Sequence, residues 1–417
     1  RVAAHEAGLI NKVNSPRLLP CLEPEAACLT VRFTESPDNF QPGNQIMIVD
    51  CGGGTVDITT HEVLSVDPLR LKELCPPTGG PWGSTYVDSE FIAWLKSFLG
   101  NKIFTRVRRQ LAFLDLVRQW EDQKTRFGGT GGEFVRLNMV GFTRMEKSET
   151  VFDAAKMQSH MGNDGWQVRG DNFIVTLPCP LVRSFFAPII DKISACLDGL
   201  KRNPSLRDIN YVFMVGGFST SPLVEAAARS ALEHDGCHVM VPPKPEGAIA
   251  KGAVLFANNA NVFQIRKARL TYGVKTSVPF DPHDPEHCSR ENTEAVESSN
   301  EGPAWVYRFS RHLEYLDDIP LDGSCDKLCY RPTKSTQSEV TVEILASHQR
   351  DIRFADVATT FPLGAVIVQL DMDADFENRA IEVQFVFGGT EITVNCFRQT
   401  TGELVGEAKL EFVQEET

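Results

Sequence analysis

The stretch IMIVDCGGGTVDITTHEV, residues 46–63, decides the fold. An apolar run ends in Asp50, the three glycines 52–54 follow, and a new alternating run begins after Thr55. Glycines have no Cβ atom, so their backbone N–H groups can approach a phosphate closely. A carboxylate at the strand end repels phosphate, but it can reach phosphate through a divalent cation or a water molecule. Asp50 is therefore a candidate for magnesium or water, and Asp57 for a supporting position.

The same stretch has an interpretation that needs no ligand. Strand-like residues on both sides of the glycines predict a β-hairpin over residues 46–64. The pattern D-x-G-G-G-T matches neither the phosphate loop G-x4-G-K-[ST] nor the dinucleotide fingerprint G-x-G-x-x-G. From this stretch alone, a tight hairpin without a ligand and a phosphate-binding turn both remain open.

A second glycine turn lies much later in the chain. Gly216, Gly217, Phe218 and Ser219 follow the apolar strand YVFMV and precede a predicted helix that extends to residue 232. The N-terminus of a helix that follows glycines is a favourable site for an anion. One such turn is weak support for a ligand site. Two of them in one α/β domain predict two loops that converge on one nucleotide.

Length, composition and charge limit the class of protein. The 417 residues predict two or three domains. The apolar fraction of 42% and the charged fraction of 23% are typical of globular proteins. The net charge of -13 argues against nucleic acid or an anionic membrane as the main partner. The sequence has no uninterrupted apolar run of about 18 residues, so we predict no membrane span.

The cysteines indicate a reducing compartment. The chain has 11 of them, and Cys51 and Cys179 lie in apolar segments, which favours buried free thiols in a cytoplasmic protein. Cys325 and Cys329 form a C-x3-C pair, but no second pair follows at the spacing of a zinc site. Two unrelated thiols are therefore favoured over a metal site at this pair.

The hydrophobic pattern changes along the chain. Apolar residues at helical spacing predict helices over residues 86–100, 108–127 and 180–202. From about residue 270 onward, alternating strands separated by turns dominate, a pattern typical of a β-sandwich. We therefore place a boundary near residue 268 between an α/β domain and a mainly β domain.

Several motifs together resemble the 70-kDa heat-shock proteins of the actin-like ATPase superfamily, and within them the divergent heat shock 70 kDa protein 12 family. The motifs occur in the same order as in that family. They are LEPEAA (22–27), VDCGGGTVD (49–57), TGGPWGS (78–84), VGGF (215–218), KGAVLF (251–256) and LTYGV (270–274).

The resemblance implies an α/β actin-like ATPase, ribonuclease H-like, followed by a mainly β C-terminal domain. Residues 1–40 would be a C-terminal remnant of lobe I, and residues 41–268 would be lobe II, with a small subdomain at about 86–170. Residues 269–417 would be a β-sandwich-like domain. The first phosphate loop of the family, D-x-G-T-T, and the lysine of lobe I that touches the transferred phosphate have no counterpart here. We therefore expect an N-terminally truncated chain that is inactive alone, whereas the full-length protein would be a weak ATPase.

The resemblance also implies a site for ATP or ADP with Mg²⁺. Glu23 would act on magnesium through water, and Asp50 would position the metal or the hydrolytic water. Glu121 and Lys124, in WEDQK, match the family's E-x-x-K pair that holds ribose and adenine. From the residues alone, an ordinary i,i+3 pair on a helix surface is the favoured interpretation. The other residues implied are Asp57 near the metal, and Gly52, Gly53, Gly54, Thr55, Gly216, Gly217, Phe218 and Glu246 at the nucleotide.

The chain also departs from the stress chaperones. Phe218, Ser219 and Thr220 stand where the family has S-T-R, so the arginine that stacks on adenine has no counterpart. The chain has no leucine-rich acidic linker and ends in VQEET. We expect a chaperone-like protein in which ATP binding is coupled to a β domain that binds a protein client or a signalling partner. The alternative is a nucleotide-binding scaffold or signalling and stress-response protein with little or no hydrolysis. A sugar kinase is less favoured, and the oligomeric state remains open.

Overall fold

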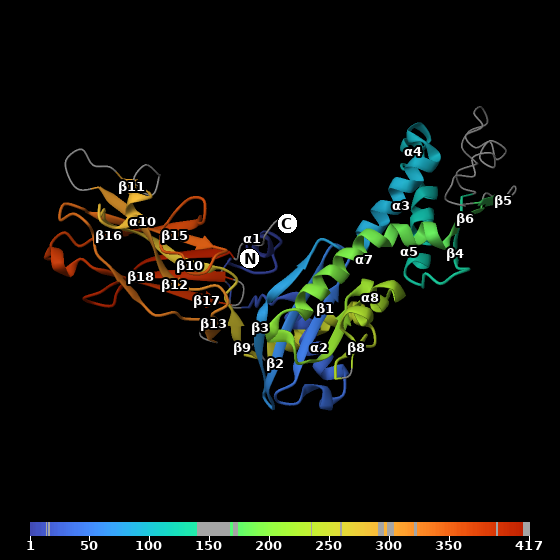
Figure 1. Cartoon of the computed structure of the whole chain (residues 1–417), viewed down its shortest axis with the longest axis horizontal. Coiled ribbons are helices and arrows are strands. Elements are labelled where there is room, and N and C mark those ends of the chain that lie inside the picture. Colours follow the sequence, from blue (N-terminus) through green and yellow to red (C-terminus); the bar gives the residue numbers. More distant parts are fainter. Residues whose placement is uncertain are drawn as a thin grey trace. The chain divides into compact units, whose positions relative to one another are not determined.

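The computed structural model describes residues 1–13, 15, 17–139, 167–169, 174–234, 236–258, 261–290, 296–297, 304–320, 323–388 and 391–411 (Figure 1). The chain separates into two compact units. Residues 23–66 and 77–258 form the α/β unit. Residues 1–22, 67–76 and 259–416 form the strand-rich unit.

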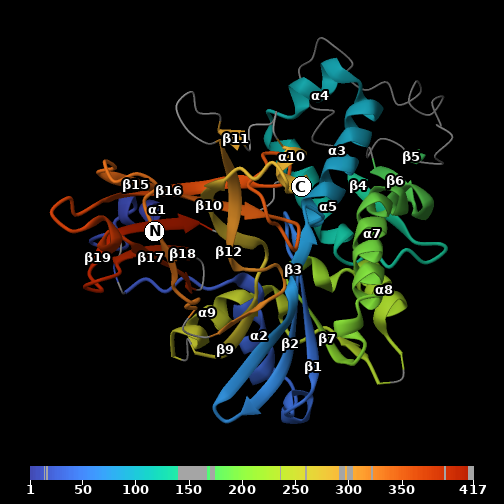
Figure 2. The same cartoon turned by 60° about the vertical axis from the view of Figure 1, so that its left-hand side comes forward.

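The sheet of the α/β unit is built on strand β1 (Gln45–Cys51). Its antiparallel neighbour is β2 (Val56–Val66), and its parallel neighbour is β7 (Ile209–Val215), which in turn pairs with β8 (His238–Met240). Figure 2 shows β2, β1 and β7 side by side. The apolar run that ends at Asp50 is buried because β1 is a central strand. The hairpin predicted over residues 46–64 is confirmed.

Helices surround this sheet. Helix α2 (Glu23–Thr34) packs against β1 and against α9 (Ala248–Asn258). The Thr30 hydroxyl donates a hydrogen bond to the Ala248 carbonyl at 2.5 Å, which joins the two helices. Helix α7 (Cys179–Lys201) lies beside α8 (Pro222–Leu232). The predicted helix over residues 180–202 therefore corresponds closely to α7.

The predicted helices over residues 86–100 and 108–127 correspond to α3 (Ser84–Leu99) and α5 (Leu111–Lys124). A further helix, α4 (Asn101–Val107), follows Gly100, whose φ of +75° interrupts the helical backbone. A small sheet lies nearby in the order β4 (Phe134–Asn138), β6 (Ile174–Pro178), β5 (Gln167–Arg169). Residues 140–166 and 170, part of the predicted subdomain, lie outside the described residues.

Aromatic side chains join α3, α5 and α7. The Phe91 ring of α3 stacks on the Trp120 indole of α5 with ring centroids 4.2 Å apart. Phe185 of α7 meets both rings edge-on. All three side chains are buried. Large stacked rings bury much apolar surface, so this cluster fixes α5, the helix that carries Glu121 and Lys124, against α3 and α7.

The strand-rich unit holds two larger sheets. The first has the order β11 (Val296–Glu297), β12 (Trp305–Leu313), β10 (Thr271–Pro279), β15 (Glu339–Ser347), β16 (Phe361–Gln369). The second has the order β14 (Leu328–Tyr330), β17 (Ile381–Gly388), β18 (Glu391–Arg398), β19 (Leu404–Glu411). Side chains from both sheets form one buried cluster that includes Tyr272, Ile344, Phe385 and Val394.

Shorter elements complete the strand-rich unit. Strand β9 (Phe263–Lys267) pairs with β13 (Asp318–Pro320) and with the start of β3 (Leu69–Gly80), whose last residues, 77–80, belong to the α/β unit. Helices α1 (Val2–Glu6) and α10 (Pro285–Cys288) are short. Arg1 of the N-terminal segment forms an ion pair with Glu391 of β18 at 3.0 Å.

Across the described ranges, no helix combines the length and the apolar character that a bilayer crossing requires. None of the 11 cysteines, all of which lie in the described ranges, forms a disulfide.

Candidate functional site

The first glycine turn is a four-residue connection between β1 and β2. The Gly52 N–H donates to the Thr55 carbonyl at 2.9 Å, which closes the turn. Asp50 and Asp57 are direct partners across the β1–β2 ladder, so their side chains lie at the same end of the sheet. The Thr55 hydroxyl donates to Asp57 Oδ2 at 2.7 Å. The predicted residues of this turn are therefore neighbours in space as well as in sequence.

The start of α3 holds the carbonyl side of this turn. The N–H groups of Gly83, Ser84 and Thr85 donate to the carbonyls of residues 54, 52 and 53, at 3.1, 3.1 and 2.9 Å respectively. In a trans peptide, the carbonyl of one residue and the N–H of the next point in opposite directions. The N–H groups of residues 53–55 therefore point away from α3. Several N–H groups turned to one side form a concavity that attracts an anion.

The second glycine turn touches the first. Strands β1 and β7 run parallel, and Asp50 is the register partner of Val215, so the chain turns at Gly216 directly beside Cys51. Gly216 has φ = +82°, and a Cβ atom there would collide with the Cys51 carbonyl and with the Asp50 carboxylate. The two turns predicted to converge are thus brought together, and only glycine fits at their contact.

Lys124 is held by two carboxylates. Its side chain is only 2% exposed, and its ammonium lies 2.7 Å from Asp88 Oδ1 and 2.6 Å from Glu121 Oε2. Asp88 Oδ1 also accepts a hydrogen bond of 2.7 Å from the Trp120 indole. Glu121 is about half exposed, at 51%. The pair is therefore more than a surface pair: its lysine is buried, and Asp88 on α3 is a third member that sequence reasoning missed.

A cavity of about 300 Å³ lies where these elements meet. Five predicted site residues line it, together with Ser84, Thr125, Thr220 and Ser221, which sequence reasoning did not assign. The five are Gly53, Glu121, Lys124, Gly217 and Phe218. Ser84 ends the TGGPWGS motif, and Thr220 and Ser221 directly follow the second glycine turn, so proximity to these motifs was the signal available in the sequence.

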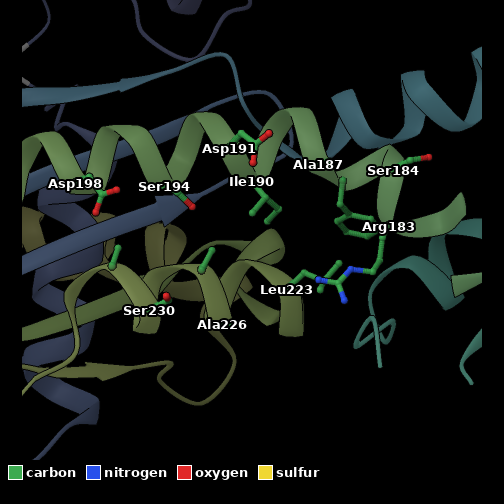
Figure 3. A pocket seen from close by; sticks show the side chains of 13 residues that line it. Arg183, Ser184, Ala187, Ile190, Asp191, Ser194, Asp198, Leu223, Ala226 and Ser230 are labelled. Carbon is green, nitrogen blue, oxygen red and sulfur yellow. The ribbon is translucent and has the colours of Figure 1, made fainter. Parts of the chain in front are cut away.

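A larger cavity of about 650 Å³ lies elsewhere in the α/β unit, between α7 and α8 (Figure 3). Its walls carry Ile190 and Leu223, several alanines of α8, and the polar side chains of Arg183, Asp191 and Ser194. It contains no residue predicted for the site. We take the smaller cavity as the candidate site because chemically distinctive side chains and two glycine turns meet there.

Phe218 and Glu246 differ in their surroundings near the second glycine turn. Glu246 lies in a short 3-10 helix (Pro245–Gly247) and is exposed, while the Pro245 carbonyl accepts from the Gly216 N–H at 3.0 Å. The Phe218 ring is buried and stacks on Phe186, with centroids 6.4 Å apart. Phe218 thus fixes the second turn to the core through its ring.

The acidic side chains at the end of β1 interact unfavourably with one another. Asp50 is 5% exposed. Burial raises the pKa of Asp50, and the negative charges of Glu23 and Asp57 raise it further, from 3.8 to about 6. Among the described residues, no group of three or more His, Cys, Asp or Glu side chains is arranged to hold a metal ion.

The comparison with known proteins first indicates the class of protein that this chain resembles. No protein-family model matches the chain. Two bacterial proteins named Chaperone protein DnaK, from Mycoplasma mycoides and Ureaplasma urealyticum, are 22% and 24% identical to it over 278 and 280 residues. Both matches cover 66% of this chain and 42% of the bacterial protein. These matches imply an actin-like ATPase fold related to that of the 70-kDa heat-shock proteins.

Particular relatives match nearly the whole chain. Heat shock 70 kDa protein 12B of Homo sapiens is 26% identical over 481 residues, covering 99% of this chain and 68% of that protein. Heat shock 70 kDa protein 12A of Homo sapiens is 25% identical over 467 residues, covering 97% and 67%. The predicted resemblance to the heat shock 70 kDa protein 12 family is thereby confirmed.

Replacing Asp88 tests how Lys124 is held. Asp88→Asn removes one of the two charges that compensate a buried ammonium, so we expect the free energy of unfolding to fall by about 2 kcal/mol. Urea unfolding at pH 7.5 measures the change. Asp122→Asn, at an exposed carboxylate of α5, is the control and should shift stability by less than about 0.5 kcal/mol. Equal shifts in the two variants would contradict the assigned role of Asp88.

The raised pKa of Asp50 predicts how stability depends on pH. The folded carboxyl holds its proton more tightly than the unfolded one, so its ionisation costs folding free energy. This cost is absent below about pH 4, grows as the pH rises, and is complete above about pH 6. Asp50→Asn should therefore raise the free energy of unfolding at pH 7.5 by up to about 3 kcal/mol.

The pH series is its own control. Other carboxylates titrate in both proteins and cancel in the difference between variant and wild type. Chemical unfolding at pH 4, 5, 6 and 7.5 should give a gain that disappears at the acid end. A gain of the same size at every pH would show that another property of the variant causes it.

Proposed function

We propose that the α/β unit binds an adenine nucleotide, ATP or ADP, together with Mg²⁺, in an atypical relative of the 70-kDa heat-shock proteins. One observation carries this proposal. Two glycine turns far apart in sequence touch at Gly216, and the cavity beside them is lined by Gly53, Gly217 and the buried Lys124. The similarity to the human 12A and 12B proteins and to DnaK supports it.

The site residues fall into groups that would bind different parts of the nucleotide and its metal ion. The N–H groups of residues 53–55 would hold phosphate oxygens, because they point away from α3. Asp50, with Glu23 and Asp57, would hold hydrated Mg²⁺, which neutralises phosphate charge when bound. Glu121 and Lys124 would face the ribose and the base. Gly52, Gly216 and Gly217 would allow the two turns to approach the ligand, and Phe218 and Glu246 would support the second turn.

We further propose that nucleotide binding is coupled to a protein client or signalling partner bound by residues 269–417. The similarity to proteins named as chaperones supports this part of the proposal. A cytoplasmic location is proposed on the free thiols, because a reducing compartment preserves them.

A second candidate is a nucleotide-binding scaffold with little or no hydrolysis. Lys124, the lysine that lines the cavity, favours it, because Lys124 is paired with Asp88 and Glu121 and would face the ribose and base, where it supplies little charge to a phosphoryl-transfer transition state. Steady-state ATP turnover of the full-length protein, with and without Asp50→Ala, separates the candidates. An ATPase loses turnover in Asp50→Ala, whereas equal turnover in both proteins supports the scaffold.

A variant with a larger side chain in the cavity wall tests nucleotide binding directly. A Cβ atom at Gly217 would meet no atom within 4 Å, so Gly217→Val should fold normally while its side chain enters the cavity. We expect ATP and ADP to bind the variant at least about tenfold more weakly than the wild type, in titration calorimetry with Mg²⁺.

Gly131→Val is the matched control. Gly131 also has open space at its Cβ position, and it does not line the cavity. This variant should bind nucleotide like the wild type. If Gly217→Val binds ATP with wild-type affinity, the proposed cavity does not receive the nucleotide.

A further inference from the structure

Ser221 occupies a capping position without capping. It precedes Pro222, the first residue of α8, and has the extended backbone usual for a residue before a helix. A serine at this position normally accepts a hydrogen bond from an N–H of the first helical turn. The Ser221 side chain makes no such bond. Its hydroxyl is therefore directed elsewhere.

The hydroxyl is buried and lines the candidate cavity. Ser221 is 2% exposed, and within the described part of the chain its Oγ has no hydrogen-bond partner. Ser221 is one of the residues that form the wall of the 300 Å³ cavity. A buried polar group without a partner destabilises a fold, so it calls for a specific explanation. A ligand that occupies the cavity would supply the missing partner.

The neighbouring hydroxyls define what Ser221 can bind. Thr220 donates its proton to the Gly217 carbonyl at 2.8 Å, and Thr125 donates to the Glu121 carbonyl at 3.2 Å. Both threonines can then only accept a further hydrogen bond. Of the three hydroxyls of Thr125, Thr220 and Ser221, that of Ser221 is the one that still has a proton to donate. A ligand acceptor atom beside these three residues would therefore be met by the Ser221 hydroxyl, whereas a ligand donor could be met by any of the three.

The charge of the wall indicates the kind of acceptor. Thr125, Thr220 and Ser221 are neutral, and Lys124 is compensated by Asp88 and Glu121. A phosphate on this wall would meet no free cation, whereas a neutral ring nitrogen or carbonyl oxygen needs none. The phosphate-binding N–H groups lie instead on the first glycine turn.

We propose that Ser221 is a specificity-determining residue that donates a hydrogen bond to an acceptor atom of the nucleobase. The inference rests on the proposed function and adds a residue and an atom type to it. Ser221 selects the base, and it contributes nothing to phosphate binding.

Ser219 provides a matched contrast in the same turn. It is fully buried like Ser221, but its hydroxyl donates to the Gly216 carbonyl at 2.7 Å, and it does not line the cavity. Ser219→Ala removes a hydrogen bond that the fold uses. Ser221→Ala removes a hydroxyl that the fold leaves without a partner. We therefore expect Ser219→Ala to lower stability without changing base recognition, and Ser221→Ala to weaken base recognition without lowering stability.

The experiment measures ATP, adenosine and tripolyphosphate binding to the wild type and both variants by calorimetry, with thermal unfolding of each protein without ligand. We expect Ser221→Ala to weaken ATP and adenosine by the same factor, about fivefold or more, and to leave tripolyphosphate unchanged. Its unfolding temperature should equal or exceed that of the wild type. Ser219→Ala should unfold at a lower temperature and keep the ratio of ATP to tripolyphosphate affinity.

Deaza analogues of ATP identify which acceptor atom of the base receives the hydrogen bond from Ser221. One analogue that lacks a ring nitrogen should bind the wild type more weakly than ATP does, and Ser221→Ala should abolish that difference. Unchanged ATP affinity in Ser221→Ala, or equal weakening of ATP and tripolyphosphate, would overturn the inference. A wild-type chain that binds no nucleotide would overturn the proposed function itself, and this result is distinct because it appears before any variant is compared.

Discussion

The parallel pairing of β1 with β7 is the constraint on which the site depends. It places Asp50 beside Val215, so β1 and β7 end at the same edge of the sheet and the turns that follow them are in contact. The turns can touch because Gly216 lacks a Cβ atom and adopts φ = +82°, a conformation that other residues rarely take. Any side chain there would push the second turn away from the Asp50 carboxylate and separate the two halves of the cavity wall.

A chain of contacts extends from this junction to α5. The carbonyls of the first turn accept from the N–H groups at the start of α3, which fixes where that helix begins. One turn further along α3, Asp88 accepts from Trp120 and Lys124 of α5. The stacked rings of Phe91 and Trp120 keep the two helices in register. The position of Lys124 in the cavity is thus set by a turn more than sixty residues earlier in the chain.

The sequence predicted what is local and periodic. The hairpin around the glycines followed from alternating apolar residues, and α3, α5 and α7 followed from helical spacing, because burial on one face leaves that imprint. Asp88 and Ser221 could not be found in this way. The importance of Asp88 comes from a buried ammonium on another helix, and that of Ser221 from a hydrogen bond that it does not make. Neither property leaves a periodic pattern in the sequence. α4 was missed because it is short and follows a glycine.

The electrostatics of the two ends of the site differ, and this difference constrains how a nucleotide could bind. At the end of β1, three carboxylates lie close enough for the charges of Glu23 and Asp57 to raise the pKa of Asp50. A phosphate cannot approach them without a cation between, since like charges repel in a partly buried site. On the α5 wall, the lysine is already neutralised. In the proposed complex, backbone N–H groups and a divalent cation would therefore meet the charge of the phosphates, and the side chains of the cavity wall would distinguish one base from another.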